Sequence, residues 1–168
     1  ARACGIAGEA VSRGFANAQL LTLAAYDQID RGNDAGALEL ARRARDEAPR
    51  SVDVQTVLAL SQWRNGQLRE ALANYDLVLR QSPASTQQRF SKACVLEELG
   101  EIARATREFE RVLNGNPNYL EAMAHLANLA VQRGDAKAAR EYGTRLQARY
   151  PNSIPAALAL AGADVEDG

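Results

Sequence analysis

The chain has 168 residues, 46% of them apolar and 5% aromatic, with a formal net charge of −1. This length allows a substantial core, but the near-neutral charge offers no basic surface to a nucleic-acid backbone, so nucleic acid is not expected as a partner. No stretch approaches the roughly 20 apolar residues of a membrane span. The abundance of alanine and arginine resembles that of bacterial proteins, and the sequence does not decide between the bacterial cytoplasm and the periplasm.

Prolines, glycines and two sets of alanines each recur every 34 residues and divide the chain into repeats. They are Pro49, Pro83, Pro117 and Pro151; Gly32, Gly66, Gly100 and Gly134; Ala37, Ala71, Ala105 and Ala139; and Ala25, Ala59, Ala93, Ala127 and Ala161. A fixed period of this length, without the alternation of a strand, predicts an all-α solenoid of antiparallel helix pairs.

In chain order, residues 1–17 have the pattern of the second helix of an incomplete repeat. Four full repeats follow, at residues 18–51, 52–85, 86–119 and 120–153. In each, the glycine ends the first helix by adopting the left-handed conformation, and the proline ends the second because it cannot continue a helix. We therefore expect eight full helices, with partial helices at both ends.

The final segment, residues 154–168, is predicted to start a further helix or a capping helix and to end in an acidic tail. Ile154, Leu158 and Leu160 would form an apolar face without the polar outer surface of a solenoid cap. We expect a fragment of a longer array; the alternative is that the ends are atypical caps. The apolar face should be covered by a neighbouring chain or make the chain self-associate.

The recurring prolines, glycines and alanines resemble the pattern of the tetratricopeptide repeat family, whose unit has the same length and has small side chains where the alanines recur. Tyr75 and Phe109 stand where the family often has an aromatic residue, whereas Ala41 and Gly143 occupy that place in the outer repeats. Gln55 and Gln62 stand where tryptophan and tyrosine are common. The resemblance implies a right-handed solenoid that serves as a binding scaffold.

In this family the first helices line a concave groove that holds the ligand. Carried over residue by residue, the resemblance places Gln19, Thr22 and Asp53 there, together with a predicted partner-binding set. That set is Tyr26, Thr56, Leu60, Trp63, Arg64, Phe90, Cys94, Glu97, His125 and Asn128. Aromatic and apolar members suit an amphipathic helix or an extended peptide, with Trp63 and Phe90 as anchors that face the groove rather than the helix seam. The alternative is that these side chains only pack against neighbouring helices.

Some members of the family clamp the acidic tails of chaperones with lysine, arginine and asparagine. Only Arg64 and Asn128 match that pattern here, and Glu97 and Glu98 would repel an acidic tail. Chaperone-tail binding is therefore disfavoured.

Catalytic and metal-binding motifs are scarce. His125 is the sole histidine, so no histidine cluster can hold a metal, and we expect no metal or cofactor. Cys94 facing His125 would give a nucleophile and its base, but a cysteine within a helix is more often a buried filler. Cys4 and Cys94 form no CxxC motif and leave the redox compartment open.

The sequence thus predicts a non-enzymatic protein-interaction module that binds a peptide or helix and acts as an adaptor or assembly scaffold. The alternative is the repeat portion of a larger bacterial enzyme or of an envelope or polysaccharide-export machine.

Overall fold

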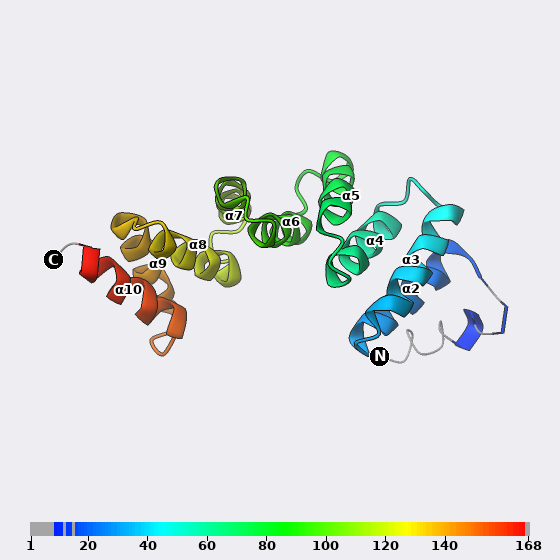
Figure 1. The fold of residues 1–168 in the computed structure, drawn as a ribbon, viewed down its shortest axis with the longest axis horizontal. Helices are drawn as coiled ribbons and strands as arrows, with labels where there is room; N and C mark the ends of the chain where they lie inside the picture. The colour runs from blue at the N-terminus through cyan, green and yellow to red at the C-terminus, as the bar shows by residue number, and fades with distance from the viewer. Residues whose placement is uncertain (1–8, 12, 15, 167–168) are drawn as a thin grey trace. The chain divides into compact units, whose positions relative to one another are not determined.

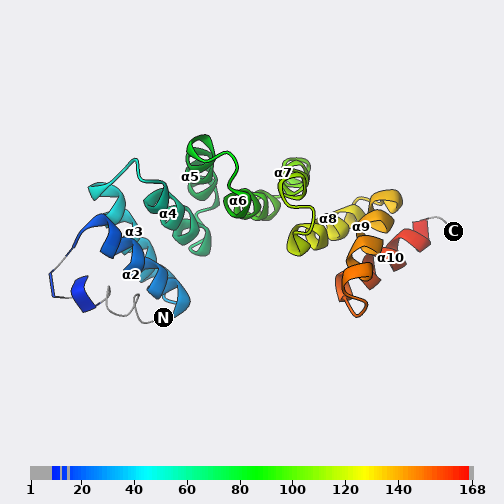
Figure 2. The same ribbon diagram turned by 180° about the vertical axis from the view of Figure 1, so that it is seen from behind.

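The computed structural model describes residues 9–11, 13, 14 and 16–166, and these residues contain helices and turns but no strand. The chain divides after Leu99 into two compact units, unit 1 and unit 2. Figure 1 and Figure 2 show the helices of each unit from opposite sides. The expected helix in residues 1–17 lies largely outside the described residues.

Unit 1 contains five helices among its described residues beyond Asn17. They are α2 (Ala18–Asp30), α3 (Asp34–Glu47), α4 (Val52–Arg64), α5 (Leu68–Gln81) and α6 (Thr86–Glu98). The first helices α2 and α4 begin at Ala18 and Val52, and the second helices α3 and α5 begin at Asp34 and Leu68. The helix boundaries therefore keep the interval of the sequence repeat.

Unit 2 contains α7 (Ile102–Gly115), α8 (Leu120–Gln132), α9 (Ala136–Arg149) and α10 (Ile154–Glu166). Helix α10 has 13 residues, as many as α8, so the partial helix expected at this end is a helix of full length. Asp164 lies within α10, where the sequence analysis placed an acidic tail. The third predicted repeat is divided between the units, with α6 in unit 1 and α7 in unit 2.

The predicted helix breaks at the four glycines are confirmed. Gly66 has φ of +72°, and its N–H donates to the Trp63 carbonyl while the Gln67 N–H donates to the Gln62 carbonyl, both at 2.9 Å. This pair of hydrogen bonds is the Schellman ending of a helix, and it requires the left-handed conformation that glycine adopts without steric cost. Gly32, Gly100 and Gly134 also have positive φ. The four prolines lie in the turns that follow the second helices.

Alanines allow the helices of unit 1 to approach closely. Ala25, Ala37, Ala59 and Ala71 are completely buried. Helix α2 contacts α3 and α4, and α4 contacts α5 and α6. Larger side chains at these four positions would force the helices apart, because a close-packed interior has no room for extra methylene groups.

Glutamines replace two of the family's usual aromatic residues in unit 1, and hydrogen bonds satisfy them. Gln55 is buried; its Nε2 donates to the Pro49 carbonyl at 2.9 Å, and its Oε1 accepts from Gln81 Nε2 at 2.8 Å. Gln62 accepts from Asn74 Nδ2 at 2.7 Å. Since buried polar groups are costly only when unpaired, these contacts let α4 and α5 tolerate the departures from the family pattern.

In unit 2, α8 packs against α7, α9 and α10. Phe109 of α7 is completely buried, and its ring stacks on His125 of α8, with centroids 4.8 Å apart and planes 17° from parallel. Two glycines bring α10 close: a Cβ atom at Gly143 would lie 3.0 Å from Leu160 Cγ, and one at Gly162 would lie 2.9 Å from Val131 Cγ1. Helices α9 and α10 lie side by side in both views (Figure 1, Figure 2).

Candidate functional site

The predicted partner-binding residues are divided between the two units. Tyr26 lies on α2, four lie on α4 and three on α6, whereas His125 and Asn128 lie on α8 of unit 2. The eight residues in unit 1 form what we call the first-helix face: Tyr26, Thr56, Leu60, Trp63, Arg64, Phe90, Cys94 and Glu97. Arg64 and Asn128 are exposed, Cys94 is buried, and the others are half-buried.

A hollow of about 530 Å³ lies between α2 and the start of α4. This α2/α4 hollow is lined by Ala18, Gln19, Thr22, Leu23, Tyr26, Ala48, Ser51, Asp53 and Val54. Tyr26, Gln19, Thr22 and Asp53 were predicted from the family resemblance to lie on the groove side. Leu23 was not, although its side chain is 39% exposed. Its place four residues after Gln19 and three before Tyr26, on the same side of α2, was the signal that could have identified it.

Asp53 lies close enough to Tyr26 for its negative charge to affect the ionisation of the phenol. Burial, and secondarily the negative charge of Asp53, raise the pKa of Tyr26 above its usual 10.0. The Thr22 hydroxyl donates to the Ala18 carbonyl at 2.7 Å, which holds that side chain against α2. The hollow therefore presents an aromatic ring with a neutral hydroxyl beside a carboxylate.

Tyr75, on α5, lies behind the first-helix face, close to residues of both α2 and α6. Its side chain is 1% exposed. Burial raises the pKa of Tyr75; a hydrogen bond with Ser91 lowers it, and the proximity of Tyr26 and Cys94 raises it further. Side chains of α2 and α6 thus both lie close to this phenol of α5, so a single buried residue supports the face from behind.

Trp63 lies in the helix seam as well as on the first-helix face, which corrects the sequence analysis. Its ring packs against a buried cluster of Ala59, Ala71, Tyr75 and Val95. Its Nε1–H donates to Glu98 Oε1 at 2.8 Å and so joins α4 to α6. The ring is half-buried because three helices meet there, a contact that spacing along α4 alone does not reveal.

Arg64 is held by an ion pair with Asp34, the first residue of α3, with Arg64 Nε 2.5 Å from Asp34 Oδ1. The neighbouring Asn65 Nδ2 donates to the Asp34 carbonyl at 2.8 Å. The positive charge that sequence analysis assigned to the ligand is therefore shared with an acidic group of the chain itself.

Cys94 is not placed to act as a nucleophile. Burial raises the pKa of its thiol to about 12, and the nearby charges of Glu97 and Glu98 add to the effect. A thiol that stays protonated at neutral pH is a poor nucleophile. The hypothetical base, His125, belongs to the other unit and stacks on Phe109.

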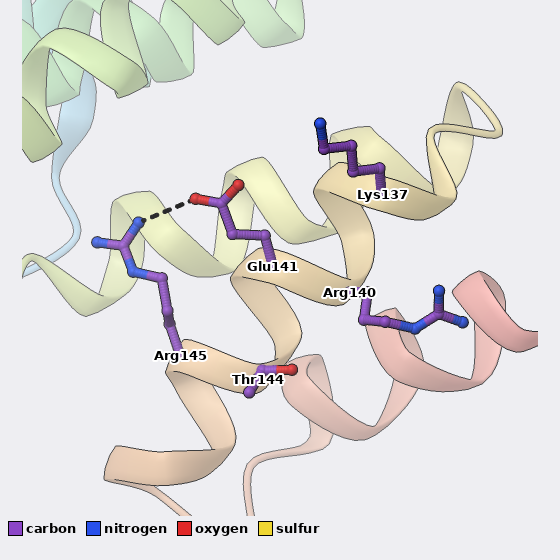
Figure 3. Close-up of a pocket in the computed structure, with 5 residues that line it drawn as sticks. All are labelled: Lys137, Arg140, Glu141, Thr144 and Arg145. Atoms are coloured by element: carbon purple, nitrogen blue, oxygen red, sulfur yellow. Dashed lines mark ion pairs between the residues drawn. The ribbon is translucent and has the colours of Figure 1, made fainter.

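A second hollow, of about 470 Å³, lies along α9 in unit 2 and is lined by Lys137, Arg140, Glu141, Thr144 and Arg145. Figure 3 shows Arg140 turned toward α10, away from Arg145, which reaches toward Glu141. Arg140 pairs with Asp164 at 2.9 Å, and Arg145 with Glu141 at 3.7 Å. Because these cations diverge and have acidic neighbours, they do not converge on one anion, and the surface is a solvated helix face.

Metal ligands do not gather within the described part of the chain: no three His, Cys, Asp or Glu side chains there are placed to share an ion. None of the described helices is both long enough and apolar enough to span a bilayer.

Comparison with known proteins identifies the fold. The family model for the tetratricopeptide repeat matches residues 22–86 and 90–154. A tetratricopeptide repeat and J domain-containing co-chaperone, DNJ1 of Fusarium oxysporum f. sp. lycopersici, is 31% identical over 110 residues, which are 64% of this chain and 21% of that protein. The chain thus corresponds to about a fifth of that relative.

Two solved structures resemble the chain over most of its length. A tetratricopeptide repeat protein from Parabacteroides merdae has a TM-score of 0.80 and 25% identity, covering 90% of this chain and 60% of that one. The first such domain of Spaghetti (RPAP3), bound to the HSP90 peptide SRMEEVD, has a TM-score of 0.63 and 20% identity, covering 67% of this chain and 90% of that one. With helix pairs that recur at the interval of the sequence repeat and a family model matching most of its length, the chain belongs to the tetratricopeptide repeat family.

Proposed function

We propose that this chain is a protein-interaction module that binds a peptide or helical segment of a partner on the first-helix face of unit 1, and that it acts as an adaptor or assembly scaffold. The observation that carries the proposal is the α2/α4 hollow, where Tyr26 and the exposed Leu23 offer apolar surface beside hydrogen-bonding side chains. Concave sites with apolar walls and a few polar groups are typical of ligand recognition.

Two further findings support a peptide as the ligand. The RPAP3 domain, which has the same fold, was solved with a peptide bound. Helices α2, α4 and α6 of unit 1 also contact one another in succession, so they present side chains along a line that an extended chain or a helix can follow. An aromatic side chain anchored in such a surface contributes a large share of the binding energy.

Site-specific photo-crosslinking in the native host tests this proposal, and the chain offers a matched pair of positions. Leu23 lines the α2/α4 hollow and is 39% exposed, whereas Leu77 lies on α5 and is 37% exposed. A photoreactive amino acid at Leu23 should capture a partner that the same group at Leu77 does not. A synthetic peptide with the crosslinked segment should then bind the purified chain and lose affinity for Leu23→Ser but not for Leu77→Ser.

Crosslinking of the same partner from both positions, or from Leu77 alone, would place binding on the second helices and overturn the proposal. The proposal also predicts that Phe90→Ala, on α6, weakens partner binding by roughly 1–3 kcal/mol, since truncation of an aromatic anchor removes a large apolar contact.

A second proposal is that the repeats form part of a larger enzyme or envelope machine. The relative DNJ1 combines its repeats with a J domain, which shows such repeats within a protein that has another domain. The full-length gene decides this point: a catalytic domain in the same reading frame would favour the second proposal.

A further inference from the structure

We infer that the α2/α4 hollow selects a basic peptide, with a lysine or arginine side chain of the partner reaching Asp53 across the ring of Tyr26. This inference rests on the proposed function and adds the chemistry of the partner. It follows from the charges in and around the hollow.

Asp53 is the single charged side chain among the described residues that line the hollow. The other lining side chains are uncharged. Some are small or apolar and the rest are polar; the small or apolar ones are Ala18, Leu23, Ala48 and Val54. Lysine and arginine have long aliphatic stems that pack on such walls while the charged end reaches a carboxylate. The face of a tyrosine ring adds attraction for a cation that lies over it.

Asp53 is available to a ligand because it is exposed and forms no ion pair with the described part of the chain. Helix N-termini favour anions, but at the start of α4 Ser51 Oγ already accepts the Val54 N–H, and Asp53 itself supplies negative charge in the first turn. Arg50, in the preceding turn, is exposed and does not line the hollow. The local field therefore favours a cation at the carboxylate.

Glu97 of the first-helix face and its neighbour Glu98 also carry negative charge. Glu97 and Glu98 of α6 lie near Cys94 and contribute to its raised pKa. Arg64 is paired with Asp34, so its positive charge is offset within the chain. An acidic peptide would meet repulsion from the carboxylates on α4 and α6, whereas a basic one would be attracted to both.

Selection from an unbiased random-peptide phage library on the immobilised chain tests the inference. Enriched peptides should combine lysine or arginine with an apolar residue. The same selection on Asp53→Lys should instead enrich peptides with aspartate or glutamate, because the charge in the hollow is reversed. Circular dichroism and thermal unfolding of each variant establish that it is folded.

Fluorescence polarisation with the most enriched peptide then separates charge from packing. Asp53→Asn should weaken binding about fivefold, the effect of losing one partly solvated ion pair. Asp46→Asn, on α3 and 67% exposed at its side chain, is the matched control and should leave the affinity unchanged. Tyr26→Phe should retain binding because it keeps the ring, whereas Tyr26→Leu should weaken it.

The outcomes distinguish this inference from the proposed function. If acidic or uncharged peptides are enriched, or if Asp53→Lys does not change the preference, the charge inference fails while peptide binding stands. If no peptide is enriched above an unrelated protein, or if Tyr26→Leu and Leu23→Ser leave binding intact, the proposed function fails and this inference fails with it.

Discussion

Leu160 of α10 occupies the space beside Gly143 of α9: a Cβ atom at Gly143 would lie 3.0 Å from Leu160 Cγ and 3.1 Å from the Ala159 Cβ. Gly143 stands where Tyr75 and Phe109 fill the core in the two preceding repeats. Leucine from the following helix thus takes the place of the aromatic ring, and Leu160 is half-buried rather than part of the exposed face that the sequence predicted.

Restoring the aromatic residue should therefore destabilise unit 2. We expect Gly143→Phe to reduce the free energy of unfolding by about 1–3 kcal/mol, because the ring collides with Leu160 and Ala159 and pushes α10 away. Urea unfolding measures the loss, and hydrogen exchange should show it concentrated in α10. Gln147→Phe, at an exposed position of the same helix, is the control. Unchanged or increased stability of Gly143→Phe would show that α10 does not pack as closely as described.

Trp63 should contribute to stability independently of any ligand. Its ring packs against the cluster around Tyr75, and its indole N–H donates to Glu98. We expect Trp63→Ala to reduce the free energy of unfolding by about 2 kcal/mol, less than for a fully buried tryptophan. Glu98→Gln, which keeps an acceptor for the indole, should have little effect. If Trp63→Ala unfolds at the wild-type urea concentration, the ring does not support the seam between α4, α5 and α6.

Cys94 should make stability depend on pH in the alkaline range. Burial raises the pKa of its thiol from 9.0 to about 12 in the folded chain, so the folded state holds the proton more tightly than the unfolded state. This contribution is complete below pH 9 and is lost as the pH rises toward 12. Between pH 8 and about pH 10.5, the free energy of unfolding should fall more for the wild type than for Cys94→Ala, since the two proteins differ in this group alone.

The same thiol should react slowly with iodoacetamide at neutral pH until urea unfolds the chain, because the thiolate is the reactive form. A Cys4→Ser background removes the other cysteine from the measurement. Rapid alkylation of Cys94 in the folded chain would contradict the raised pKa.

An apolar stripe on α10 should drive association with a second copy of the chain. Ile154 is 72% exposed, Leu158 65% and Val165 80%, and Ala161 is exposed although the equivalent alanines of α2, α4 and α8 are buried. Spacings of four, three and four residues put these side chains on one face of the helix. Two copies can bury the stripe around a twofold axis, each covering the other.

We expect Leu158→Glu to lower the average mass in concentration-dependent sedimentation, and Ala157→Glu, beside it, to act similarly. Thr144→Glu, exposed on α9, is the control. Leu160→Glu is unsuitable because Leu160 packs against Gly143. A wild-type chain that remains monomeric at high concentration would exclude this association.

The helix boundaries and the alanine seam could be predicted from the sequence because they depend on local requirements. A glycine ends a first helix through its own φ, as at Gly66, and Ala59 with Ala71 lets two backbones approach whatever else surrounds them. Such constraints repeat with the chain, so their spacing is visible without coordinates.

Only the tertiary structure decided which side chains are free to meet a ligand. Trp63 and Cys94 have the spacing of groove residues, yet helices from neighbouring repeats cover them wholly or in part. Leu160 fills the space beside Gly143, and the α2/α4 hollow forms where Tyr26 and Asp53 approach from different helices. Burial depends on the volume of residues that are distant in sequence, and a repeat pattern specifies the place of a side chain on its helix but not what packs against it.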